Sequence, residues 1–86
     1  MNSRTTRRFR EAYAELPEQV RQHARRAYKL FRSDPSHPSL NLKKVHAEQP
    51  IYSVRIGRSY RALGRMDGAD LIWFWIGAHG EYDKLL

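Results

Sequence analysis

Two arginines on neighbouring predicted strands carry the clearest chemical signal in this sequence. The segments Tyr52–Ile56 and Tyr60–Arg65 are separated by Gly57–Ser59. If these three residues form the loop of a hairpin, Arg55 lies directly opposite Arg61 and both side chains point to one face. Two facing positive charges are mildly destabilising without an anion. Because guanidinium groups bind phosphate oxygens bidentately, we expect a phosphate-bearing ligand here.

His79 and Tyr82 follow the last predicted strand, close to the face that would carry these arginines. Both side chains can exchange protons, the tyrosine when neighbouring arginines lower its pKa. With RNA as the ligand, Arg61, His79 and Tyr82 would suffice to catalyse attack of a 2′-hydroxyl on the adjacent phosphate. The alternative is structural: the arginines pair with nearby acids (Glu48, Glu81 or Asp83), while His79 and Tyr82 only seal the sheet edge.

Further candidate contacts to nucleic acid are cations and one aromatic ring that a base could stack on: Lys43, Lys44, Arg55, Arg58, Arg65 and Phe74. A lysine pair in a loop is as often simply solvated. No two histidines stand four residues apart and the chain has no cysteine, so we expect no metal site. No phosphate-binding loop or dinucleotide fingerprint is present, and we expect no cofactor.

The composition favours one small basic domain over residues 1–86. Lys and Arg number 16 against 9 Asp and Glu, and the first 45 residues carry all of the +7 excess. Such a charge favours polyanions or acidic proteins as partners. The absence of cysteine is typical of a reducing compartment, and the longest apolar run is too short to span a membrane. We therefore expect a cytoplasmic protein without a membrane partner.

Two helices are predicted before the strands. Phe9, Ala12, Tyr13 and Leu16 recur at helical spacing after Thr6, a suitable N-cap, and a second apolar stripe runs from Val20 to Phe31 behind Pro17. The short link between the two stripes predicts a helical hairpin. A proline-rich loop over Ser33–Ser39 then leads into an antiparallel meander whose second turn carries Asp67 and Gly68. The predicted fold class is α+β, with the helical hairpin packed on a small antiparallel sheet.

The three-residue loop separates the residues of the first hairpin into two faces. One face is apolar or small and would lie under the helices: Tyr52, Val54, Ile56, Tyr60, Ala62 and Gly64. The other would carry Ser53, Arg55, Arg61 and Arg65 with Ile51 and Leu63. A second hairpin closed at Asp67 and Gly68 would set Arg65 opposite Asp70. It would also place Trp73 and Trp75 under the helices and Phe74 beside Arg61.

The order of these segments resembles the RelE/ParE toxin superfamily of bacterial type II toxin–antitoxin systems, particularly its compact ParE-like or RelE-like members. The resemblance covers residues 6–86 and rests on the two helices, the proline-rich loop, Lys43–Val45, Tyr52–Leu63 and Trp73–His79. It implies a microbial RNase-like fold. RelE-type members cleave mRNA in the ribosomal A site, whereas ParE-type members poison DNA gyrase. Many members have an N-terminal strand, which we expect to be nearly absent here.

The resemblance also implies roles for individual residues. Arg55 matches a basic strand residue of the RelE-type site, Arg61 its phosphate-binding arginine and Tyr82 its C-terminal tyrosine. His79 falls where several relatives have Arg or His, and Ser53 stands where lysine is frequent. Lys43 and Lys44 fall near basic residues that precede the first core strand of the family.

The sequence therefore predicts the toxin of a type II toxin–antitoxin system, of the kind that serves plasmid stabilisation. Its expected activity is metal-independent, ribosome-dependent endoribonuclease cleavage of mRNA, which inhibits translation. The expected partners are mRNA on the ribosome and a cognate antitoxin, with a toxin–antitoxin heterotetramer as the candidate assembly. The antitoxin would cover the basic surface and four apolar residues expected to be exposed: Ile51, Leu63, Ile72 and Ile76. The alternatives are a non-enzymatic inhibitor of DNA gyrase and a plain RNA-binding module.

Overall fold

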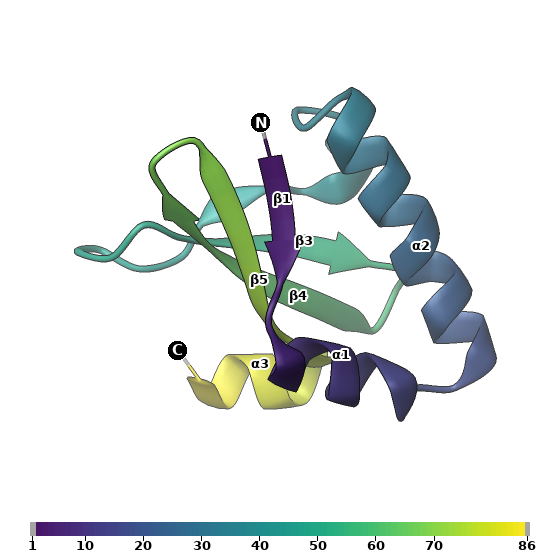
Figure 1. Ribbon diagram of the computed structural model, residues 1–86. Coiled ribbons are helices and arrows are strands. Elements are labelled where there is room, and N and C mark those ends of the chain that lie inside the picture. The colour runs from purple at the N-terminus through teal and green to yellow at the C-terminus, as the bar shows by residue number, and fades with distance from the viewer. Residues whose placement is uncertain (1, 86) are drawn as a thin grey trace.

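A five-stranded sheet forms the centre of the molecule in the computed structural model, which describes residues 2–85 (Figure 1). The sheet order is β1-β5-β4-β3-β2, and β1 is parallel to β5 while the other neighbours are antiparallel. The strands are β1 (Asn2–Thr5), β2 (Lys43–Lys44), β3 (Ile51–Ile56), β4 (Tyr60–Asp67) and β5 (Asp70–Ala78). The consecutive hairpins β3-β4 and β4-β5 confirm the predicted meander.

Three α-helices accompany the sheet: α1 (Arg7–Ala14), α2 (Glu18–Ser33) and α3 (His79–Leu85). The hydroxyl of Thr6 accepts a hydrogen bond from the backbone N–H of Phe9 at 3.1 Å, which confirms the predicted N-cap of α1. A short 3₁₀ helix, η1 (Pro38–Leu40), interrupts the proline-rich loop. None of the helices within residues 2–85 is long and apolar enough to cross a membrane. The α+β class and the packing of both helices on the sheet are as predicted. The predicted helical hairpin is wrong, because α1 packs on β5 and α2 packs on β3 instead of against each other (Figure 1).

The hydrophobic core lies between α1, α2 and one face of the sheet. Phe31 of α2 and Trp73 of β5 are both buried and meet edge to face, with ring centroids 5.3 Å apart. Val54, Ile56 and Ala62 of the predicted apolar face join this cluster. Ile76 also lies in this cluster and is only 4% exposed, so the prediction that Ile76 is exposed is wrong.

The first hairpin has the predicted register. Ile56 pairs with Tyr60 and Arg55 pairs with Arg61, so Gly57–Ser59 form the three-residue loop. Gly57 has a φ of +61° in this loop, and a Cβ there would lie 2.5 Å from the His23 ring. The loop therefore needs glycine both for its backbone conformation and for its close packing against α2.

The second hairpin differs from the prediction. Its turn residues are Gly68 and Ala69, so Asp67 pairs with Asp70 and Arg65 pairs with Ile72 rather than with Asp70. Gly68 has a φ of +62°, which suits the first central position of a two-residue turn. Asp70 instead forms an ion pair with Arg4 of β1, whose Nη2 lies 2.7 Å from Oδ2 of the aspartate. The partner of Asp70 therefore lies on the N-terminal strand, which was expected to be nearly absent.

A β-bulge in β5 reverses the side-chain alternation at Phe74. Trp73 pairs with Gly64 and Trp75 pairs with Leu63, which leaves Phe74 without a partner in β4. Trp73 therefore packs under the helices as predicted, but Trp75 lies on the opposite face, where its ring covers Gly77. Arg61 pairs with Gly77, so the prediction of Phe74 beside Arg61 is wrong. Leu63, on the Trp75 face, is 3% exposed and not the exposed residue expected.

Two further elements depart from the expectation. The N-terminal strand is present: β1 pairs with β5, and the hydroxyl of Ser3 accepts a hydrogen bond from the indole N–H of Trp73 at 2.7 Å. The segment after the last predicted strand, for which no helix was predicted, forms helix α3, which lies at the lower end of the sheet in Figure 1. Because α3 begins at His79, it places the C-terminal candidates next to β4 and β5.

Candidate functional site

The sheet face opposite the apolar core carries Arg55 and Arg61 side by side. Directly paired residues of an antiparallel hairpin point to the same side, so the register brings the two guanidinium groups to one surface. Arg55 is exposed, and its Nε donates to the carbonyl of Gly57 at 3.0 Å. Neither arginine forms an ion pair within residues 2–85, so the described acids do not neutralise the pair.

Arg61 is buried, with 5% of its surface exposed. Its Nε donates to the hydroxyl of Ser53 at 2.7 Å, and Nη2 makes a weak hydrogen bond to the carbonyl of Asn41 at 3.4 Å. The guanidinium carbon lies 5.1 Å from the centre of the Tyr82 ring. All three of these contacts are with neutral groups, so they hold the guanidinium without cancelling its charge.

Helix α3 brings Tyr82 and His79 to the same surface. Tyr82 is 4% exposed and its ring lies beside the Arg61 guanidinium, while the His79 ring lies 5.5 Å from the Tyr82 ring. The backbone N–H of His79 donates to the carbonyl of Ser59 at 2.7 Å, which ties the start of α3 to the β3-β4 loop. One turn later in α3, Asp83 lies 3.5 Å from Nε2 of His79. The three proposed catalytic residues, Arg61, His79 and Tyr82, are thus neighbours.

The two lysines of β2 have different surroundings. Lys43 pairs with Ser53 and therefore points to the Arg61 face, whereas Lys44 pairs with Tyr52 on the other side. Nζ of Lys44 donates to the carbonyls of His46 and Ala47, at 2.8 and 3.2 Å. Lys43 is exposed and makes no side-chain hydrogen bond among the described residues. Only one member of the pair is therefore placed to reach a ligand on this face.

The other predicted contact residues lie further from Arg61. Arg58 is exposed in the β3-β4 loop, next to the backbone contact of His79. Arg65 lies two residues beyond Leu63 on the same face, with Nη2 3.4 Å from the side-chain oxygen of Gln49. Phe74 is half-buried in the bulge, away from the register position of Arg61. We refer to Lys43, Ser53, Arg55, Arg61, His79 and Tyr82 together as the arginine face.

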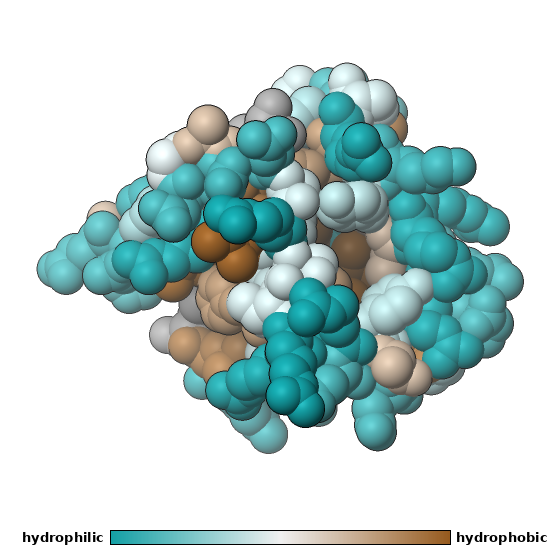
Figure 2. Space-filling model, viewed as in Figure 1, coloured by the Kyte–Doolittle hydropathy of each residue, from teal (hydrophilic) through white to brown (hydrophobic). Residues whose placement is uncertain are grey.

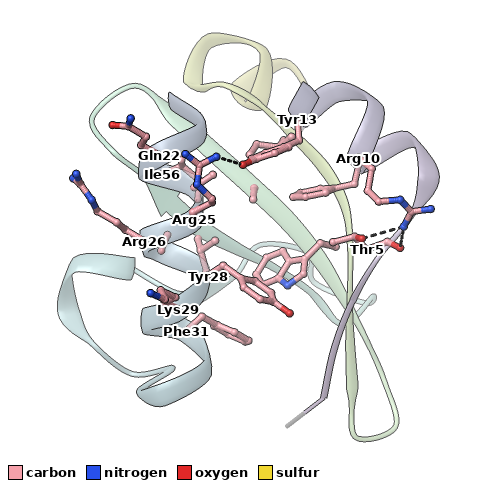
Figure 3. A pocket seen from close by; sticks show the side chains of 17 residues that line it. Thr5, Arg10, Tyr13, Gln22, Arg25, Arg26, Tyr28, Lys29, Phe31 and Ile56 are labelled. Atoms are coloured by element: carbon pink, nitrogen blue, oxygen red, sulfur yellow. Dashed lines mark hydrogen bonds between the residues drawn. The ribbon is translucent and has the colours of Figure 1, made fainter. Parts of the chain in front are cut away.

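A groove of about 650 Å³ opens on the other side of the sheet, between α1 and α2. Figure 2 shows brown, apolar atoms at the bottom of a hollow between β1 and α2. The floor of the groove includes Val54, Ile56 and Trp73, and Arg26 and Lys29 of α2 are part of its lining. Figure 3 shows Tyr13 and Arg25 meeting at one side of it, joined by a hydrogen bond of 2.7 Å.

The charges along this groove belong to arginines and one lysine. Hydrogen bonds to Tyr13 and, to a smaller extent, to Glu18 raise the pKa of Arg25. Hydrogen bonds from Arg21 and Arg25 lower the pKa of the Glu18 carboxyl. Arg26 and Lys29 form no ion pair within residues 2–85. An apolar floor beneath a basic rim suits an amphipathic segment with acidic flanks better than a nucleic acid.

Three residues of the arginine face and its borders gained importance only from the structure. The hydroxyl of Ser53 and the backbone carbonyl of Asn41 accept hydrogen bonds from Arg61. The Trp75 ring lies against Gly77, the residue that pairs with Arg61 across the strands. The alternation of β3 places Ser53 on the correct face, but only the strand register reveals its bond. Asn41, with φ and ψ of 47°, was detectable as an asparagine just after a proline-rich turn. Among residues 2–85 no group of three His, Asp or Glu side chains could hold a metal ion.

A family model and several solved structures match this chain. The family model described as ParE-like toxin domain matches residues 18–84, which include α2, the strands β2 to β5 and all but the last residue of α3. No curated protein sequence matches the chain.

Solved structures match nearly the whole chain at low sequence identity. The RelB–RelE antitoxin–toxin complex from Methanococcus jannaschii contains a chain that is 16% identical with a TM-score of 0.75, covering 95% of this chain and 96% of that one. The YoeB/ParE toxin from Agrobacterium tumefaciens is 14% identical with a TM-score of 0.73, at 92% and 99% coverage. A chain of the toxin–antitoxin complex RelBE2 from Mycobacterium tuberculosis is 24% identical with a TM-score of 0.62, at 91% and 96% coverage. These similarities concern the fold.

Proposed function

Because the chain belongs to the ParE-like toxin domain family, within the RelE/ParE superfamily of toxins, we propose that it inhibits translation by cutting mRNA on the ribosome. The observation that carries this proposal is the arginine face. A buried guanidinium without a described counter-ion lies beside an exposed arginine, a histidine and a tyrosine. This set of groups matches the needs of phosphate chemistry on RNA.

The proposed reaction needs no group beyond these side chains and the RNA. The 2′-oxygen attacks the adjacent phosphorus, a new O–P bond forms, and the bond from phosphorus to the 5′-oxygen of the next nucleotide breaks. The products are a 2′,3′-cyclic phosphate and a 5′-hydroxyl. His79 and Tyr82 are the candidates that take the proton from the 2′-hydroxyl and give one to the leaving oxygen. Arg61 and Arg55 stabilise the charge that develops on the phosphate oxygens.

Two assays test this function against its main rival. Purified protein is added to ribosomes translating a defined mRNA, and primer extension maps new 5′ ends. We expect cleavage within codons that requires the ribosome. A supercoiling assay with DNA gyrase is run in parallel, and we expect no inhibition. Intact mRNA together with inhibited gyrase would favour the ParE-type function. If mRNA stays intact and gyrase is not inhibited, the remaining alternative is a plain RNA-binding module.

The different surroundings of the β2 lysines give a prediction with a built-in control. We expect Lys43→Ala to weaken binding of a 2′-O-methylated RNA oligonucleotide and to reduce the slope of log affinity against log salt by about 0.7, the effect of one lost phosphate contact to a single strand. Lys44→Ala removes the same charge, but the ammonium of Lys44 is bound to the backbone carbonyls of His46 and Ala47 and not to a ligand. The salt dependence of RNA binding should therefore stay unchanged in this variant. Equal slopes for the two variants would show that Lys43 does not contact an RNA phosphate.

For the antitoxin partner, we propose that an amphipathic segment with acidic flanks occupies the groove between α1 and α2. Leu63 is buried on the other face of the sheet and offers no surface to this segment. The groove, which Ile76 also lines, combines an apolar lining with the basic rim that such a segment needs.

Arg26 and Arg8 provide a matched pair for the groove, because both are exposed helix arginines and only Arg26 lines it. We expect Arg26→Glu to weaken binding of the neutralising antitoxin about tenfold or more, mainly through replacement of attraction by repulsion. Arg8→Glu changes the net charge equally and should cost much less. Affinities from isothermal titration decide between them, and an equal loss would show that only net charge matters.

A further inference from the structure

The surroundings of Arg61 are unusual for a buried charge. Burying a guanidinium without a counter-ion is costly, and buried arginines are normally paired with a carboxylate. The five ion pairs within residues 2–85 do not include Arg61. Its described contacts are the Ser53 hydroxyl, the Asn41 carbonyl and the Tyr82 ring.

Ser53 makes the shortest of these contacts. It is fully buried, at 0% exposure, and lies on β3 two residues before Arg55. Its hydroxyl accepts from Nε of Arg61 at 2.7 Å, a bond on the side of the guanidinium nearest the chain. Among the described residues, Nη1 has no hydrogen-bond partner and Nη2 has only the weak one to Asn41. The outer edge of the guanidinium, which forms bidentate bonds to phosphate, is therefore nearly unoccupied.

We infer that Ser53 is a positioning residue that holds Arg61 by a neutral hydrogen bond, so that the full positive charge stays available to an anion. An aspartate at the same position would hold the arginine more strongly but would cancel its charge. Asn41 supports the same arrangement, because the acceptor that it offers to Nη2 is a neutral backbone carbonyl. The identity of the anion as RNA rests on the proposed function, whereas the neutral support of Arg61 does not.

The inference separates stability from binding, and a pair of isosteric variants tests it. Ser53→Asn and Ser53→Asp add nearly the same volume, and only the aspartate adds a charge. We expect Ser53→Asp to have the higher midpoint of thermal unfolding of the two, because it provides a counter-ion for a buried guanidinium. We expect it to bind a 2′-O-methylated RNA decamer about tenfold or more weakly than Ser53→Asn, through loss of the charge on Arg61.

A purely structural role for Ser53 predicts the opposite relation, in which the more stable variant also binds RNA at least as well. Ser53→Asp that binds RNA as tightly as Ser53→Asn, or that is the less stable of the two, overturns the inference. If both enlarged side chains prevent folding, Ser53→Ala serves instead. It removes the acceptor without adding volume, and we expect the Arg61 Nε–Hε signal in a ¹⁵N–¹H spectrum to broaden or disappear. An unchanged signal would contradict the positioning role.

These outcomes are distinguishable from failure of the proposed function. If the unmodified protein binds RNA and the two variants differ as expected, but no preparation cuts mRNA on ribosomes, the nuclease activity is wrong and the role of Ser53 stands. If the unmodified protein cuts mRNA and the two variants cut and bind equally well, the nuclease stands and the role of Ser53 is wrong.

Discussion

Arg61→Gln should abolish most mRNA cleavage without unfolding the protein. Glutamine removes the charge that would stabilise the developing negative charge on the phosphate, and loss of one such group typically costs about 10²- to 10³-fold in rate. The free energy of unfolding should change little or rise, since the variant no longer buries a charge without a described counter-ion. Primer extension on translated mRNA gives the rate, and thermal unfolding gives the stability.

Arg65→Gln is the matched control for this variant. Arg65 lies on the same strand and the same face, but it is exposed and beyond Leu63. We expect its cleavage rate to stay within about threefold of the unmodified protein, as for loss of a single peripheral contact. Equal losses for the two variants would mean that the arginines act only through net charge. A large loss of stability in Arg61→Gln with no separate effect on cleavage would make Arg61 a structural residue.

Tyr82→Phe should have the second largest effect. The substitution keeps the ring that lies 5.1 Å from the Arg61 guanidinium and removes only the hydroxyl. If that hydroxyl transfers a proton, we expect cleavage to fall about 10²-fold or more while RNA affinity changes by no more than about twofold. The same primer-extension assay, run at saturating protein, measures the chemical step, and fluorescence anisotropy with 2′-O-methylated RNA measures the affinity.

Tyr60→Phe controls for the loss of a tyrosine hydroxyl elsewhere in the sheet. Tyr60 packs against the core on the helix side of β4, away from Arg61. Its variant should cut mRNA normally. Normal cleavage by Tyr82→Phe would leave the tyrosine with a packing role, and His79 would then need another partner for proton transfer.

The register of the first hairpin was predictable because the two faces of the hairpin differ clearly in polarity. With a three-residue loop, every residue of one face is apolar or small, whereas a two-residue loop would place arginines on both faces. The structure has this register, with Arg55 opposite Arg61. Burial of one face therefore determines the register, and the register in turn places the arginines together.

The second hairpin lacked such a contrast. Trp73, Phe74 and Trp75 are all large and apolar, so the sequence does not reveal which of them is the extra residue of a bulge. The structure places Trp73 against Phe31 and Trp75 over Gly77, on opposite faces. Both environments accept an indole, and the alternation rule fails where both faces are apolar.

The edge strand β1 and helix α3 were missed for different reasons. Strand β1 consists of four polar residues whose pairing depends on distant partners, such as Asp70 for Arg4. Helix α3 is short and contains Gly80, which lowers its intrinsic helical preference. Tertiary contacts, including the Tyr82 ring against Arg61, compensate for that weak preference. His79 and Tyr82 of α3 could be chosen as site residues from the sequence, but the burial of Tyr82 could not be predicted.

The proposed function requires that the outer edge of the Arg61 guanidinium is available to an RNA phosphate. The most direct test is to follow the Arg61 side-chain N–H signals in ¹⁵N–¹H spectra during titration with a 2′-O-methylated RNA. We expect a saturable shift of these signals that is lost in Ser53→Asp, while signals from the groove between α1 and α2 stay in place. Unchanged Arg61 signals at saturating RNA, or shifts confined to the helix arginines, would contradict it.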